Sequence, residues 1–135
     1  MSEDIDELVR RGVESCNARD PEAGLALWDP GCEWHPFLST EVEGAAAYRG
    51  HEGIRRWFRD TDEMFSAVAW TVEEVRNLGD GRILVLGHRH ARGRIGGVEV
   101  SSQIGQLFDL RDGRIVRGWA YPTHDQALRA AGLAR

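Results

Sequence analysis

The apolar residues nearest the N-terminus recur at helical spacing and predict a first helix. They are Ile5, Leu8, Val9, Gly12, Val13 and Cys16. A second, short helix is predicted next, because Asp20 can cap it and Pro21 suits its first position. This helix carries Leu25, Leu27 and Trp28, and Asp29-Pro30-Gly31 ends it. We expect the two helices to form a hairpin.

The next apolar segments predict one strand and one helix. Cys32 to Pro36 reads as a short strand. The turn from Tyr48 to Gly53 then opens an amphipathic helix. The inner face of that helix carries Ile54, Trp57, Phe58 and Phe65.

From about Ala67 the apolar pattern changes to extended runs, which predict four strands. They are Trp70 to Val75, Ile83 to Arg92, Val98 to Leu110 and Arg114 to Tyr121. Asp80-Gly81, Gly96-Gly97 and Asp112-Gly113 separate these runs, and such pairs suit two-residue hairpin turns. The strands are therefore expected to form an antiparallel meander.

Thr123 and Gln126 resemble a capping box for a last short helix, Ala127 to Ala131, which Gly132 ends. Helices precede a run of antiparallel strands, so the expected fold class is α+β. The chain has 135 residues and shows no repeat or linker-like segment. We expect one domain over residues 1–135.

The composition excludes several functions. The net charge is −5 and both signs are scattered, which argues against a nucleic-acid partner. All seventeen basic residues are arginine, so neither a Schiff-base lysine nor a P-loop lysine is present. The acidic start, Met1 to Glu7, does not resemble a signal peptide, and no apolar run has membrane-spanning length. We expect a soluble, cytoplasmic protein without a membrane partner, in which Cys16 and Cys32 act as small buried hydrophobes.

Five segments together resemble the SnoaL-like branch of the nuclear-transport-factor-two-like superfamily. They are Trp28 to Pro30, Glu33 to Pro36, Tyr48 to Arg56, Asp112 to Val116 and Ala127 to Leu133. The resemblance implies a cone-shaped, curved, mixed and mostly antiparallel sheet wrapped around N-terminal helices, with a central pocket and often a dimer. Members include ketosteroid isomerases, polyketide cyclases, dehydratases, epoxide hydrolases and non-catalytic binding modules, so the fold does not settle the function.

The chain departs from the enzymes of this superfamily at their catalytic positions. Ketosteroid isomerase-like enzymes place a carboxylate base where this chain has His35-Pro36. Their first-helix tyrosine falls near Gly12, and their later acid near Gly105-Gln106, so we do not carry steroid isomerisation over. The cyclases use an aspartate shortly after the last-strand tryptophan, here Trp119. The nearest counterparts, which we interpret as helix-capping residues, are Thr123, His124 and Asp125.

His35 is the candidate proton carrier, because an imidazole titrates near neutral pH and a strand fixes its orientation. Strict alternation places Trp34 and His35 on opposite faces of the strand. If Trp34 faces the pocket, His35 points away from it unless Pro36 bends the strand. Both registers stay open at this point.

His88-Arg89-His90 is a second group of interest, because the two histidines share one face of a strand. The H-x-H spacing is typical of cupin metal sites, but no glutamate follows within five residues and His124 is the only later histidine. We therefore expect no metal and no other cofactor. We interpret His88, His90 and Arg92 as a polar pocket mouth.

Most aromatic residues are expected in the core, and some are expected to contact a ligand. The candidate ligand-binding residues are Trp34, Tyr48, Phe58, His88, Trp119 and Tyr121. Gln106 shares a strand face with Phe108. Gly118 and Ala120 form the face of the last strand opposite Trp119, and they make room in the pocket if that face points inward.

Our leading hypothesis is a cofactor-independent acid–base enzyme of the isomerase, cyclase or dehydratase type. It binds a small apolar molecule, cyclic or polyketide-like, and forms a homodimer. Its catalytic residues are His35, with His90 or Gln106 polarising a substrate oxygen. The alternative is a non-catalytic ligand-binding or dimerisation module of the same fold. A third hypothesis is a metal-dependent barrel that uses His35, His88 and His90.

Overall fold

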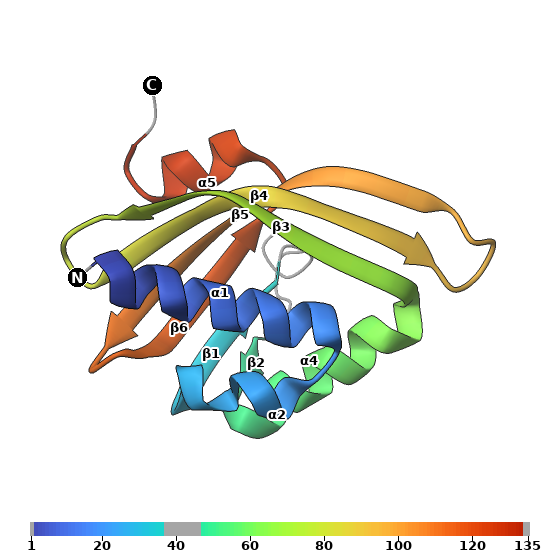
Figure 1. Ribbon diagram of the computed structural model, residues 1–135, viewed down its shortest axis with the longest axis horizontal. Coiled ribbons are helices and arrows are strands. Elements are labelled where there is room, and N and C mark those ends of the chain that lie inside the picture. Colours follow the sequence, from blue (N-terminus) through green and yellow to red (C-terminus); the bar gives the residue numbers. More distant parts are fainter. Residues whose placement is uncertain (1, 37–46, 134–135) are drawn as a thin grey trace.

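The computed structural model describes residues 2–36 and 47–133 (Figure 1). Its helices are α1 (Ser2–Ala18), α2 (Pro21–Gly24), the 3-10 helix η1 (Leu25–Leu27), α4 (Gly50–Met64) and α5 (His124–Ala130). Its strands are β1 (Trp28–His35), β2 (Tyr48–Arg49), β3 (Phe65–Asn77), β4 (Arg82–Gly93), β5 (Glu99–Arg111) and β6 (Arg114–Tyr121). Within these ranges no helix combines the length and the apolar character needed to cross a membrane.

The strands form one sheet in the order β2-β1-β6-β5-β4-β3. β1 pairs in parallel with β6, and the other pairs are antiparallel. The sheet curves over α1, α2 and α4, while α5 lies on its other side (Figure 1). We name the first side the inner face and the second the outer face. The expected α+β class, with a curved mixed sheet around N-terminal helices, is confirmed.

The predicted two-residue turn at Asp112-Gly113 is confirmed, because Arg111 pairs with Arg114. The one at Gly96-Gly97 was wrong, because these glycines lie in a longer loop that Gly93 and Val98 close. Gly96 and Gly97 adopt φ angles of 81° and 64°, and Asp112 and Gly113 adopt 54° and 77°. Glycine reaches such angles without steric cost, and aspartate tolerates them better than most residues. The β4, β5 and β6 strands therefore form the predicted antiparallel meander.

Two predicted boundaries were wrong. Trp28 begins β1 instead of extending the second helix, and the strand continues through Asp29-Pro30-Gly31. The pairing with β6 shifts register between Trp28 and Glu33, and such irregular stretches accommodate a proline. Phe65, expected on a helix, has extended backbone angles and begins β3.

The predicted cap of the last helix is confirmed, although α5 begins at His124. The backbone nitrogen of Gln126 donates to Thr123 Oγ1 at 3.1 Å. The helix packs closely on the outer face, because a Cβ added to Gly105 would lie 2.3 Å from the Ala127 Cβ. The glycine therefore allows α5 to sit where it does.

Buried side chains form a cluster on each face of the sheet. On β4, Ile83 and Val85 belong to the inner cluster, whereas Leu84 and Leu86 belong to the outer cluster with Ala127 of α5. The strand is thus buried on both faces along its first half. The polar residues His88, His90 and Arg92 follow on the outer face of its second half.

Candidate functional site

A cavity of about 80 Å³ lies between the inner face and the helices α1, α2 and α4. We call it the inner cavity. Its wall is mainly aliphatic and aromatic and includes Leu8, Val13, Trp34, Trp57, Trp70 and Val85. One water molecule needs roughly 10–15 Å³ of such space, so the cavity has room for several waters or one small organic molecule.

Trp34 is the centre of the aromatic part of the wall and is 2% exposed. Its ring lies edge-on to two others and stacks with a third, at centroid distances of 5.7 Å for Trp28, 5.3 Å for Trp57 and 6.0 Å for Phe108. A Cβ at Gly118 would lie 2.7 Å from the Phe108 ring and 3.0 Å from Trp34. The last strand therefore turns its small residues inward to make room for these rings.

The polar groups of the wall are few. Trp34 Nε1, which can only donate, is buried without a hydrogen-bond partner among the described residues. Gln106 lines the same cavity. Burial raises the pKa of the Cys16 thiol to about 12, so that this group stays neutral. Of the described residues that line the cavity, none is a carboxylate or an imidazole. The wall therefore offers neutral polar groups, among them the donors Trp34 Nε1 and the Gln106 amide.

Three predicted site residues, Trp34, Phe58 and Gln106, line the inner cavity. Tyr48 lies near the same region, but its hydroxyl donates to Asp60 at 2.6 Å. Burial, followed by the contact with Asp60, raises the pKa of Tyr48 to about 12. Its hydroxyl is therefore already engaged within the protein.

His35 lies on the outer face, so the register that pairs an inward Trp34 with an outward His35 is the one the structure adopts. The His35 ring stacks on Trp119 at a centroid distance of 5.7 Å, and its Nε2 lies 3.4 Å from a Glu33 oxygen. Tyr121 and Trp119 pack against the outer cluster. Neither residue is among those that line the inner cavity. Their proposed ligand contacts stay predictions.

His88 and His90 also lie on the outer face, in alternation with the inner residues of β4. His90 Nδ1 lies 2.7 Å from the Ser101 hydroxyl, and His88 Nδ1 lies 2.8 Å from a Glu73 oxygen. Arg92 pairs with Glu99 at 3.2 Å. The expected pocket mouth of His88, His90 and Arg92 was therefore wrong, because strand alternation turns it away from the inner cavity.

The third hypothesis grouped His35 with His88 and His90, and the structure does not bring these three together. β1 and β4 are separated by β6 and β5 in the sheet. His35 contacts Trp119 instead, while His88 contacts Glu73. The hypothesis was wrong in this combination of residues.

Sequence reasoning missed several residues of the cavity wall, among them Cys16, Trp70 and Val85. The sequence pattern showed that these residues are apolar, and it predicted them to be core residues. The sequence held no signal that their packing leaves a void, because a void depends on how helices and sheet meet.

Comparison with known proteins gives one family and many related structures. A model of the SnoaL-like domain matches residues 9–118. No curated protein matches the chain. A protein of unknown function from Burkholderia pseudomallei K96243, described as NTF2-like, has a TM-score of 0.78 and 22% identity, over 96% of this chain and 97% of its own.

Two further solved structures contain small molecules. TerC, co-crystallised with polyporic acid, has a TM-score of 0.75 and 19% identity, over 94% of this chain and 95% of its own. A protein from Catenulispora acidiphila DSM 44928 with a ketosteroid isomerase-like fold, in complex with trimethylamine, has a TM-score of 0.75 and 19% identity, over 94% of this chain and 93% of its own. At these identities the likeness shows the fold alone.

Proposed function

The chain belongs to the SnoaL-like domain family, and from that premise we propose that it binds a small, mainly apolar molecule carrying a hydrogen-bond acceptor. The ligand occupies the inner cavity. One observation carries this proposal: a mainly apolar, partly open cavity with a few polar groups at its wall, which is the usual composition of a small-molecule site.

The acceptor on the ligand follows from the donors of the wall. A buried donor without a partner costs about 1–3 kcal/mol, so a ligand oxygen that reached Trp34 Nε1 would remove this penalty. Because Trp34 is 2% exposed, the oxygen reaches that atom only if neighbouring rings shift. The Gln106 amide is the second donor. A cyclic ketone combines the required apolar body with one acceptor.

Acid–base turnover of the isomerase, cyclase or dehydratase type is the second candidate, and Gln106 favours it. An amide donor in a mainly apolar site can polarise a substrate carbonyl. The reaction also needs a general base, and the described residues of the cavity wall do not supply one, because His35 and His90 lie on the outer face. Structural neighbours with bound small molecules support binding of a ligand by this fold and leave catalysis to experiment.

Binding can be tested with cyclohexanone and methylcyclohexane, two molecules of similar size that differ in the acceptor. Several tryptophans line the cavity, so their fluorescence reports an occupant. We expect saturable quenching and a raised melting temperature with the ketone and a weaker effect with the hydrocarbon. Equal effects of the two would remove the acceptor from the proposal, and no effect of either would remove the ligand.

Gly12 of α1 provides a matched pair of variants for the same measurement. A Cβ there would meet only Leu27 Cδ1, at 3.7 Å, so the position accepts a side chain that projects into the cavity. Gly12→Leu should remain folded and lose ketone binding. Gly12→Ala should keep binding and gain stability, because glycine in a helix interior costs roughly 0.5–1 kcal/mol relative to alanine. Binding by the Gly12→Leu protein would place the ligand elsewhere.

A further inference from the structure

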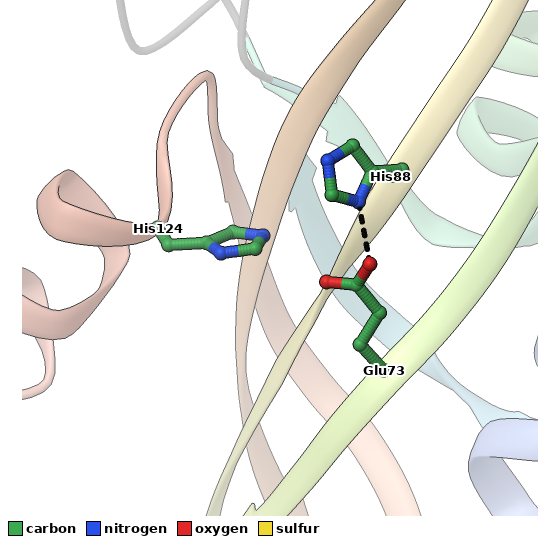
Figure 2. A group of neighbouring side chains, drawn as sticks. All are labelled: Glu73, His88 and His124. Atoms are coloured by element: carbon green, nitrogen blue, oxygen red, sulfur yellow. Dashed lines mark ion pairs between the residues drawn. The ribbon is translucent and has the colours of Figure 1, made fainter.

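Three side chains with metal-binding atoms meet on the outer face, away from the inner cavity. They are Glu73 of β3, His88 of β4 and His124 of α5, and each offers one ligand atom within 4.8 Å of the others. Figure 2 shows His124 reaching from the start of α5 towards the other two. The group joins three elements that are distant in the sequence.

A β-bulge places the carboxylate. Val72 pairs with Gly87 and Glu74 pairs with Leu86, so Glu73 is the extra residue between them. β-Bulges re-aim side chains and are enriched near functional sites. The two strands approach closely here, because a Cβ at Gly87 would lie 2.0 Å from the Thr71 carbonyl oxygen. Glu73 therefore lies directly beside His88.

The helix α5 places the second imidazole. Its start is fixed by Thr123 at the cap and by the His124 backbone nitrogen, which donates to Gln103 Oε1 at 2.9 Å. The rings of His88 and His124 lie 5.7 Å apart between centroids and 75° from coplanar. Neither histidine belongs to the cavity wall, so the proposed ligand site does not require them.

We propose that Glu73, His88 and His124 bind one divalent transition-metal ion, with Zn²⁺ as the representative ion. Two imidazoles and a carboxylate form a donor set that suits zinc and similar ions, whereas Mg²⁺ and Ca²⁺ prefer oxygen ligands. Water completes the coordination, because three protein ligands leave a position open. The Glu73 and His88 side chains are 52% and 35% exposed, so the ion can enter from solvent.

The distances define the adjustment that binding needs. Ligand atoms of a tetrahedral zinc site lie roughly 3.3–3.5 Å apart, given bonds of about 2.0–2.1 Å. His88 Nδ1 and the Glu73 oxygen are 2.8 Å apart and must separate, while the widest pair must close. His124 Nε2 lies 2.8 Å from the Gly87 carbonyl oxygen, and coordination through that nitrogen gives up this contact. We therefore expect weaker zinc affinity than at a preformed tetrahedral site.

Zinc titration of the full chain, carrying no histidine tag, tests the site. Competition with a chromogenic chelator at neutral pH should give one Zn²⁺ per chain. Glu73→Gln, His88→Ala and His124→Ala should each weaken binding by about tenfold or more, since loss of even an outer-shell partner costs roughly 10–100-fold. Mg²⁺ and Ca²⁺ should not compete. Absence of stoichiometric zinc binding would overturn the proposal.

Two neighbouring residues provide matched controls. His90 lies on the same face of β4, two residues from His88, and Glu74 follows Glu73 on β3. His90→Ala and Glu74→Gln should bind zinc as the unmodified chain does. If His90→Ala weakens binding as much as His124→Ala, an H-x-H pair holds the ion and the proposed site is wrong. NMR gives a second readout, in which zinc shifts the ring signals of His88 and His124 but not those of His90.

Discussion

The two faces of the sheet differ in what they bury and in what they leave for chemistry. Among the described residues, the inner face meets α1, α2, η1 and α4 and borders a partly open apolar cavity with neutral polar groups. Among the described residues, the outer face carries the short helix α5, which begins with His124, and the strand residues His35, His88 and His90. Both faces come from the same strands. Successive residues of one strand therefore face an apolar interior and an ionisable surface in turn, so strand alternation decides which side chains line the inner cavity.

Loss of a large inner ring should have the largest effect on stability. Trp34→Ala should lower the free energy of unfolding by about 3–5 kcal/mol, because it removes a buried aromatic side chain and enlarges a cavity. Trp119→Ala, on the outer face, should cost less, since Trp119 is only partly buried. Urea denaturation of the two variants measures both values. Equal losses would mean that the outer face contributes as much packing as the inner one.

The fit of α5 on the outer face should have the next largest effect. Gly105→Ala brings a methyl group to 2.3 Å from the Ala127 Cβ, and neither group can rotate away. Overpacking of this kind typically costs about 1–3 kcal/mol. Hydrogen exchange should be faster in α5, and zinc affinity should fall because His124 moves with the helix.

Gly93→Ala is the control for that substitution. A Cβ there would lie no closer than 3.6 Å to its neighbours, and Gly93 is the last residue of β4. Its stability should stay within roughly 0.5 kcal/mol of the unmodified chain. If Gly105→Ala behaves in the same way, α5 is not held by the contact with Gly105.

The stability of the inner face should also respond to alkaline pH. Burial raises the pKa of the Cys16 thiol from 9.0 to about 12. The folded chain therefore keeps this proton where the unfolded chain loses it, so the contribution is complete below pH 9.0 and is lost as pH rises towards about 12. Stability should fall less steeply over this range in Cys16→Ala and Cys16→Ser. Unchanged slopes in both variants would show that Cys16 is not the responsible group.

Local patterns predicted the parts of the fold that depend on neighbours in sequence. The Asp112-Gly113 turn is confirmed by its backbone angles and the flanking strand pair, and the cap of the last helix by the Gln126-to-Thr123 hydrogen bond. These signals work because a positive φ or a helix cap is a property of a few adjacent residues.

The parts that escaped prediction depend on contacts between distant residues. Alternation gave two registers for β1, and only the fit of Trp34 beside Gly118 decides between them. The bulge at Glu73 arises from pairing with β4 and leaves no local mark. His124 was interpreted as a capping residue, and its approach to His88 requires the helix to fold back onto the sheet. The sequence alone therefore could not predict that Glu73, His88 and His124 lie close together.

We expect the smallest effect on ligand binding and turnover from a substitution of His35. This variant tests most directly which face of the sheet carries the chemistry. His35→Ala removes a stacked ring from Trp119 on the outer face and leaves the cavity wall unchanged. Ketone binding, and any turnover found with carbonyl substrates, should then match those of the unmodified chain. Gln106→Leu should weaken both, because it replaces an amide donor in the wall by an apolar side chain of similar size. Lost turnover in His35→Ala, at unchanged stability, would instead assign the chemistry to the outer face and restore His35 as the proton carrier.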